Sequence, residues 1–298
     1  MVFKEGKMPK KLSVKQQRDY RADGYVYPLD ALSAADVSRY REELRKAEEH
    51  LGGSLMEIDK KYRGNLHFLC KWVDELARTP AIVDAAEDLL GPDILLYTTR
   101  FFIKEPHSEG IAAWHQDSTY FGLRPFDHVT AWVALCNVTA DAGPVEFAVG
   151  SHIRGQLQQK SGLIKNSVNT AGQIIVEWFD QSEIDRAILK PGQFSLHHTC
   201  VVHQSQPNRS DERRVGIALS YIPTRTRYIG KRRMPASLVR GKDDYNHFDL
   251  QPRPQVDFGE IEMQRHDTTF KAYIESFYEQ LGEAEKDLPP EAAAGMVY

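Results

Sequence analysis

The chain has 298 residues, of which 41% are hydrophobic and 27% are charged, and its formal net charge is −4. This is the composition of an ordinary globular protein, and a charge so near neutrality gives no electrostatic basis for nucleic-acid binding. No apolar run approaches the ~20 residues of a membrane span, and the N-terminus has no apolar stretch like that of a signal peptide. The three cysteines lie far apart without a C-x-x-C pair, which favours free thiols. We therefore expect a cytoplasmic protein that binds neither nucleic acid nor a membrane.

The first 90 residues are predicted to be mainly helical. A helix is expected over residues 34–50, because apolar side chains recur there at helical spacing and Ser33 and Asp36 resemble a capping box. An extended segment at residues 24–28 precedes it. A further helical stretch is expected over residues 66–90, closed by a Gly-Pro pair.

From residue 94 the pattern changes to short β-rich segments separated by Gly, Pro, Asn and Asp. The predicted strands cover residues 94–97, 100–104, 130–136, 145–149, 172–178, 192–197 and 215–221. So many short strands without intervening helices favour a sandwich or barrel over a doubly wound sheet.

A final helix is expected over residues 270–282. We predict one domain over 1–298, mainly β with flanking helices. It divides into a helical N-terminal part (about 1–90), a barrel core (about 94–223) and a C-terminal lid and helix (about 224–298).

The motif Trp-His-Gln-Asp at residues 114–117 carries the strongest chemical signal. In an extended segment, His115 and Asp117 project to the same side. A second histidine from a distant strand would complete two imidazoles and one carboxylate on one face of an octahedral metal, the arrangement of non-haem Fe(II) oxygenases. The H-x-[DE] pattern also occurs at 107–109 and 247–249, and an isolated match is more often a histidine that merely lies near an acid. Only the match at His115 is followed by β-rich sequence and by a histidine-dense segment at 197–203.

Several motifs occur in a fixed order between residues 24 and 254. They are Gly-Tyr-Val-Tyr-Pro (24–28), Lys-Glu-Pro (104–106), Trp-His-Gln-Asp (114–117), Gly-Ser-His (150–152), the segments 190–198 and 203–214, and Leu-Val-Arg-Gly-Lys (238–242). With these motifs the chain resembles the phytanoyl-CoA dioxygenase (PhyH) family of Fe(II)/2-oxoglutarate-dependent oxygenases. Within that family it resembles the branch that contains the syringomycin-type chlorinating enzymes. The resemblance implies a double-stranded β-helix, a jelly-roll or cupin-like barrel, with Fe(II) as cofactor and 2-oxoglutarate and O2 as co-substrates.

The resemblance also implies roles for individual residues. His115, Asp117 and His203 would be the catalytic iron ligands, and Arg214 would bind the distal carboxylate of 2-oxoglutarate, with Arg213 as the alternative if the register differs by one.

Ser205 would assist at the same carboxylate, and Trp132 and Lys104 match positions near the co-substrate. For Trp132 the alternative is a core aromatic residue, and for Lys104 it is a solvated charge at a strand end. His197 has the strand parity of His203 and is a candidate neighbour of the metal site, whereas His198 and His152 are expected to be structural.

The expected reaction is hydroxylation of an unactivated C–H bond of a small metabolite or natural-product intermediate. Halogenases of this type carry Gly or Ala in place of the carboxylate ligand, whereas this chain has Asp117. Desaturation or cyclisation on the same scaffold remains an alternative, as does a metal-dependent cupin-like isomerase or hydrolase. A barrel that only binds a ligand would lack the metal ligands.

The substrate is predicted from weaker signals. Residues 224–242 contain seven basic and no acidic residues, which indicates either a solvated loop or a lid for an anionic phosphate, nucleotide, carrier-tethered or carboxylate handle. Arg240 is the residue of this stretch expected to bind substrate. Tyr120, Phe121 and Trp178 are candidate pocket aromatics, with core packing as the alternative.

Overall fold

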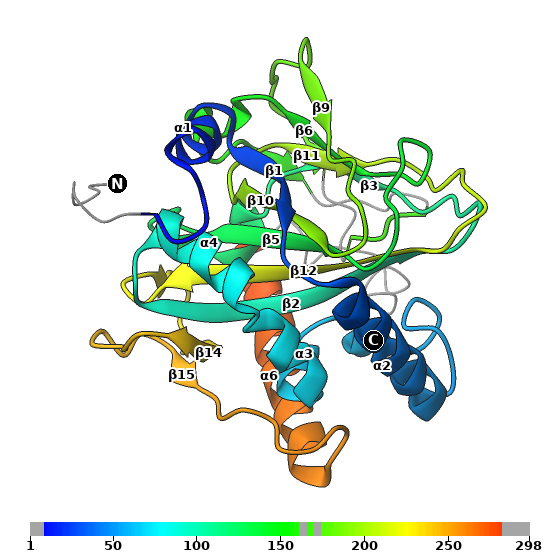
Figure 1. Ribbon diagram of the computed structural model, residues 1–298. Helices are drawn as coiled ribbons and strands as arrows, with labels where there is room; N and C mark the ends of the chain where they lie inside the picture. Colours follow the sequence, from blue (N-terminus) through cyan, green and yellow to red (C-terminus); the bar gives the residue numbers. More distant parts are fainter. Residues whose placement is uncertain (1–8, 161–165, 170–173, 282–298) are drawn as a thin grey trace.

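The computed structural model describes residues 9–160, 166–169 and 174–281, and β-strands make up its centre (Figure 1). The strands are β1 (Tyr25–Asp30), β2 (Ile94–Lys104), β3 (Ala112–His115), β4 (Leu123–Arg124), β5 (Val129–Ala134), β6 (Val145–Ala148), β7 (Gln159–Lys160), β8 (Ile174–Ile175), β9 (Ile184–Arg186), β10 (Gln193–His198), β11 (His203–Ser205), β12 (Arg214–Pro223), β13 (Arg227–Tyr228), β14 (Pro235–Arg240) and β15 (Asp249–Leu250).

These strands form two main sheets. The larger has the order β1-β10-β5-β12-β2-β14-β15 and the smaller has the order β3-β11-β6-β9, with the pairs β13-β4 and β7-β8 beside them. Within the two main sheets all neighbours are antiparallel except β14 and β15. The mainly β fold with flanking helices is confirmed. The two sheets share no strand, so they are open layers and not one closed barrel.

Helices flank the sheets and cover the larger one (Figure 1). The α-helices are α1 (Val14–Asp23), α2 (Ala34–Leu51), α3 (Lys71–Ala77), α4 (Pro80–Leu90), α5 (Ser118–Phe121) and α6 (Glu260–Leu281), and the 3-10 helices are η1 (Lys60–Arg63), η2 (Leu66–Phe68) and η3 (Ser151–Arg154). No helix in these described ranges is long and apolar enough to cross a membrane.

Strand β2 shows how one segment serves both the core and the cavity. Its side chains alternate, so that Phe101 and Ile103 are buried in the core, where Phe101 packs against Trp72 of α3. Burial of each such side chain contributes roughly 1.5–3 kcal/mol. The opposite face of the same strand carries Arg100 and Phe102 toward a cavity between the two sheets. The site is therefore positioned by a strand whose other face is held by the core.

The capping box predicted at Ser33 is present, with Asp36 as its reciprocal partner, and α2 has the expected extent. The stretch at 66–90 is not one helix. Thr79 is extended before Pro80, and α4 begins at that proline, because proline has no N–H and disfavours helical geometry in the residue before it.

Other boundaries also differ from prediction. The two strands expected over 94–104 are one continuous strand, β2, since Thr98 and Thr99 between them are β-branched residues that favour extended backbone. The segment 172–178 contains only the two-residue strand β8, and its first two residues lie outside the described part of the chain. Helix α6 begins ten residues earlier than expected, at Glu260.

Candidate metal and co-substrate site

A cavity lies between the two sheets, and side chains from both sheets line it. The larger sheet contributes residues of β2, β5, β10 and β12, and the smaller contributes residues of β3, β6 and β11. Helix α6 turns Phe270, Tyr273 and Phe277 toward the same space, at the i, i+3, i+7 spacing of one helix face. The cavity is thus enclosed by the two sheets on opposite sides and by α6 on a third side.

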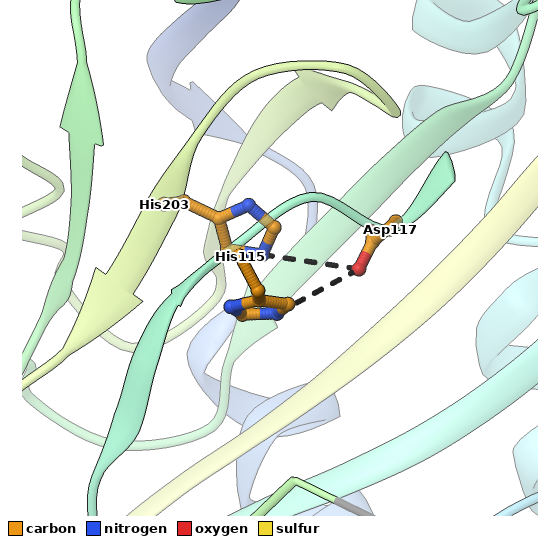
Figure 2. A group of neighbouring side chains, drawn as sticks. All are labelled: His115, Asp117 and His203. Carbon is orange, nitrogen blue, oxygen red and sulfur yellow. Dashed lines mark ion pairs between the residues drawn. The ribbon is translucent and has the colours of Figure 1, made fainter. Parts of the chain in front are cut away.

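His115, Asp117 and His203 meet at this cavity (Figure 2). The Nε2 atoms of both histidines lie 3.9 Å from Oδ1 of Asp117, and one ligand atom from each residue falls within 4.8 Å of the others. His115 and His203 are directly opposite each other on β3 and β11, which explains the close approach of their rings. Sequence segments nearly 90 residues apart are joined here by one antiparallel pairing.

Asp117 reaches the site by a different route from the one expected. Strand β3 ends at His115, and Asp117 has the helical backbone angles φ −68° and ψ −32° at the start of α5. Between them, the buried side chain of Gln116 points away and donates to the carbonyls of Gly155 and Cys200. This anchor and the turn into α5 bring the carboxylate beside the imidazoles without continuous extended backbone.

The two imidazoles are arranged to bind a metal. Nδ1 of His115 donates to the carbonyl of Ala113 (2.8 Å), and Nδ1 of His203 donates to that of Val201 (3.0 Å). These bonds place the proton on Nδ1 and leave the Nε2 lone pairs directed at the shared point. Burial lowers the pKa of both histidines, so both rings are neutral at pH 7, the form that binds metals.

Asp117 is held as an oriented carboxylate. Its Oδ2 accepts from Thr130 Oγ1 at 3.2 Å and lies 3.6 Å from Nε2 of His197, so Oδ1 faces the two ligand histidines. Burial would raise the pKa of Asp117, but the close approach of His197 and the surrounding imidazoles hold it well below its usual range. His197 therefore contacts Asp117, as its strand parity predicted, and Thr130 is a residue that sequence reasoning missed. The donor set of two imidazoles and one carboxylate fits a divalent iron.

Arg214 lies on β12 at the end of the cavity, 2% exposed. Its Nη1 donates to the carbonyl of Gly143 and to Ser205 Oγ (3.1 Å), while its buried Nε has no partner within the described ranges. No carboxylate of the described residues forms an ion pair with it. A buried guanidinium without a counter-ion requires an anion, so Arg214 marks a place where an acidic ligand group would be stabilised.

Arg213, the alternative to Arg214, faces elsewhere. It forms ion pairs with Glu48 and Glu105, at 2.6 and 2.9 Å. Because neighbouring residues of a strand point to opposite sides, only one of the two arginines can face the cavity, and that one is Arg214.

The structure excludes the interpretation of Lys104 as a solvated charge at a strand end. Lys104 is 1% exposed, and its Nζ donates to Ser205 Oγ at 2.5 Å and to the carbonyls of Ser205 and Gln206. Burial and the charge of Arg214 lower its pKa to about 6. Lys104 is not among the cavity-lining residues and lies behind Ser205, so it supports the anion site from beneath.

Trp132 combines its two expected roles. It is buried in the core cluster and also lines the cavity, where its ring centre lies 5.4 Å from the Arg214 guanidinium carbon. Its neighbour on β12 is Gly216, where a Cβ would fall 2.0 Å from the indole. Only glycine leaves room for the ring at that position.

The predicted substrate residues divide into two groups. Tyr120 and Phe121 line the cavity, as expected of pocket aromatics. Trp178 is 74% exposed and outside the cavity, where Arg154 lies over its ring. Arg240 is also outside, with ion pairs to Asp84 and Glu87.

The structure therefore gives no support to Arg240 and Trp178 as substrate residues. Three other cations of the basic stretch also form ion pairs: Arg225 with Asp127, Arg232 with Glu275 and Lys242 with Asp244. The partners of Arg225, Arg232 and Arg240 come from segments distant in the sequence, so charge along the sequence did not indicate that these arginines are paired.

The remaining H-x-[DE] matches hold no metal group within the described ranges. His107 pairs with Asp211 and Glu109 with Arg209, both at exposed positions, and His247 stacks on Tyr245 in a loop.

Arg100, Tyr273 and the other α6 residues are cavity residues that sequence reasoning missed. For Arg100 a signal was present: Arg100, Phe102 and Lys104 alternate with the apolar Phe101 and Ile103 and so share one face of β2.

Comparison with known proteins agrees with this site. The model of the phytanoyl-CoA dioxygenase (PhyH) family matches residues 20–216. L-proline trans-4-hydroxylase of Streptomyces griseoviridis is 25% identical over 231 residues, covering 68% of this chain and 83% of the relative. Among solved structures, the non-heme monooxygenase ThoJ in its apo form has a TM-score of 0.79 and 30% identity, covering 89% of this chain and 98% of ThoJ.

A more distant structure, CytC3 with Fe(II) and alpha-ketoglutarate, has a TM-score of 0.64 at 21% identity and covers 84% of this chain and 97% of CytC3, which shows a shared cupin-like fold. The family match spans most of the chain, and the cavity brings together a His-Asp-His group and a buried arginine without an acidic partner among the described residues. The chain therefore belongs to the phytanoyl-CoA dioxygenase family and is an Fe(II)- and 2-oxoglutarate-dependent oxygenase.

Proposed function

We propose that this enzyme hydroxylates an unactivated C–H bond of a small organic molecule, with His115, Asp117 and His203 holding the iron. Arg214 and Ser205 bind the distal carboxylate of 2-oxoglutarate, and Trp132 forms the adjacent wall. The observation that carries the proposal is the pairing, in one cavity, of the His-Asp-His group with a buried arginine that lacks an acidic partner among the described residues. An isomerase or hydrolase with the same metal ligands would have no use for that arginine.

The bound iron and 2-oxoglutarate would supply the oxidising power that activates dioxygen, and the chain's own residues do the rest. The imidazole tautomers and Thr130 fix the ligand directions, and Arg214 fixes one end of the co-substrate. The aromatic residues Phe102, Tyr120, Phe121 and Phe277 give the cavity an apolar lining that excludes water and suits a hydrocarbon part of the substrate.

Hydroxylation is favoured over halogenation by Asp117. Its carboxylate occupies the metal position that a halide would need, and Thr130 and His197 hold it there. Desaturation and cyclisation need the same ligands, so product analysis separates them: hydroxylation adds one oxygen atom to the substrate, whereas the other two outcomes remove two hydrogen atoms.

An anaerobic titration with Fe(II) and then 2-oxoglutarate tests the proposal. We expect a visible charge-transfer absorption that appears only after both additions. In Arg214→Met, the 2-oxoglutarate concentration needed to produce this absorption should be at least tenfold higher. Metal binding without any spectral response to 2-oxoglutarate would contradict the assignment of the cavity. Succinate release against a panel of small molecules then identifies the substrate.

A further inference from the structure

Arg100 is a second arginine in the cavity that the iron and 2-oxoglutarate do not employ. It projects from β2 into the cavity, where its Nη2 donates a long hydrogen bond to the carbonyl of Val168 (3.5 Å) and its guanidinium carbon lies 5.7 Å from the ring centre of Phe102. No acidic side chain in the described ranges forms an ion pair with it. The charges of Lys60 and Arg63 in η1 act on Arg100 and have the same sign, and Arg63 is bound to the carbonyls of Leu55 and Met56.

The charges of the cavity do not balance without a further anion. Asp117 is the only acidic residue that lines it, and Arg100 and Arg214 are its two guanidinium groups, counting the described residues. A divalent iron and the Arg214 cation are matched by Asp117 and the two carboxylates of 2-oxoglutarate. The positive charge of Arg100 is left over, and a buried unpaired charge is costly.

Arg100 lies too far along the sheet to share the co-substrate. On the paired strands, Arg214 is opposite Lys104 and Ala218 is opposite Arg100, so the two arginine levels differ by four residues, or about 13 Å. Tyr273 of α6 also lines the cavity, and the charges of both Arg100 and Asp117 act on its hydroxyl. A molecule bound at Arg100 that extends toward the metal ligands would therefore pass near Tyr273.

Two small residues of β12 line the cavity near Arg100. Ala218 lies directly across from Arg100 and Ser220 follows it, whereas Gly216 lies under the ring of Trp132. Two further polar groups are near: Asn169 Nδ2 is buried without a partner in the described ranges, and Asn65 follows Gly64, which pairs with the Arg100 backbone. The pocket offers several N–H donors around one cationic group.

We infer that the substrate of this enzyme carries a carboxylate that binds Arg100, with its oxidisable carbon chain directed along β12 toward the metal site. The inference rests on the proposed function and specifies the substrate class. A carboxylate is favoured over a phosphate because the surplus is a single charge and because Phe102 and Phe270 make the surroundings apolar. The anionic handle considered from the sequence is thus placed at Arg100 and not at Arg240.

The test compares acids with neutral molecules of the same shape. Hexanoate and phenylacetate, their carboxamides, and phenyl phosphate are titrated into anaerobic enzyme loaded with Fe(II) and saturating 2-oxoglutarate. A ligand next to the metal shifts the charge-transfer band, whereas displacement of 2-oxoglutarate abolishes it. We expect the acids to shift the band, the amides to bind at least tenfold more weakly, and Arg100→Met to remove the preference for acids.

Arg240→Met is the matched control, because Arg240 is the rival arginine and lies outside the cavity; it should bind the acids like the unaltered enzyme. Arg100→Lys, which keeps the charge, should retain part of the preference. Equal binding of acid and amide, acid binding that survives Arg100→Met, or no response to any acid would each overturn the inference. If phenyl phosphate binds more tightly than the acids, the anionic group of the substrate is a phosphate and not a carboxylate.

Failure of the proposed function would look different, since then no charge-transfer band would form at all. In that event, the same acid and amide pairs are compared by thermal unfolding of the metal-free protein. Stabilisation by acids that is lost in Arg100→Met but kept in Arg214→Met would still support the anion site. Stabilisation that is lost only in Arg214→Met would refute it.

Discussion

Asp117 decides which chemistry the metal site can perform. Its Oδ2 is occupied by Thr130 and His197, and its Oδ1 is directed at the point where the two histidine Nε2 atoms converge. In the proposed site a single side chain thus supplies a ligand, contributes one negative charge and excludes a competing anion from the metal.

Replacement of Asp117 by Ala should reduce succinate formation at least about 100-fold, because loss of residues that only support metal ligands already costs 10–100-fold. In chloride-containing buffer the vacated position could admit a halide, and mass spectrometry of the product would detect chlorination. Asp180→Ala, at an exposed loop position, should have no effect. Chlorination by the unaltered enzyme would contradict the proposed role of Asp117.

Lys104 is expected to make the affinity for 2-oxoglutarate dependent on pH. Its pKa of about 6, lowered by burial and by the Arg214 charge, means that it is neutral at pH 7 to 8 in the free protein. The dianionic co-substrate favours the protonated amine, so binding takes up a proton and weakens as the pH rises above 6, by up to about tenfold per pH unit.

Calorimetric or spectroscopic Kd values between pH 6 and 8 measure this slope. Lys104→Met should flatten it, whereas Lys61→Met, which removes a surface ion pair with Asp267, should leave it unchanged. A slope that persists in Lys104→Met would show that another group takes up the proton.

At the scale of elements, β2 and β12 form the cavity because their paired residues alternate between core and site. The register places Arg214 opposite Lys104 and Ala218 opposite Arg100, so one strand pair carries both of the proposed anion sites. Helix α6 closes the remaining side, and its contact with α5 joins it to the segment that carries Asp117.

Phe277 anchors that helix. It is 2% exposed and stacks on Tyr120 of α5 with ring centres 4.7 Å apart. Phe277→Ala should lower the free energy of unfolding by about 3 kcal/mol, at the low end for such truncations because one side of the ring borders the cavity. Urea denaturation measures the change, and Lys271→Ala, exposed on the same helix, should stay within about 0.5 kcal/mol of the parent. Equal effects of the two substitutions would mean that α6 is not held through this contact.

At the scale of the whole molecule, the site joins the two sheets, so its ligands should stabilise the fold. Iron contacts are expected from β3, α5 and β11, and co-substrate contacts from β11 and β12. A ligand that binds only the folded protein contributes about 2.7 kcal/mol at a concentration one hundred times its Kd.

In the presence of Fe(II), 2-oxoglutarate at that concentration should therefore raise the Tm by about 5 °C. Anaerobic thermal unfolding measures this increment. Arg214→Met should abolish the Tm increment from 2-oxoglutarate but retain the increase in Tm that Fe(II) alone gives. Arg213→Met is the control, since it breaks surface ion pairs and lowers the starting Tm but should keep the increment. An increment that survives in Arg214→Met would place 2-oxoglutarate elsewhere.

The chemistry could be predicted from sequence because its residues lie in short motifs. The Trp-His-Gln-Asp motif and the spacing from His203 to Arg214 indicate a metal and a diacid, and alternating short strands predict the mainly β fold. Local rules also located the capping box at Ser33, since a cap depends on residues three positions apart.

Only the tertiary structure decided which charges are left without partners. No local sequence feature tells whether Arg240 or Arg100 has an acidic partner. Arg240 forms ion pairs with Asp84 and Glu87 of α4, whereas Arg100 faces a cavity opposite Ala218. Likewise Lys104, at the end of a strand, is buried because the chain around Ser205 folds over it. Ion pairing and burial depend on segments 100 or more residues away, and no local pattern records those contacts.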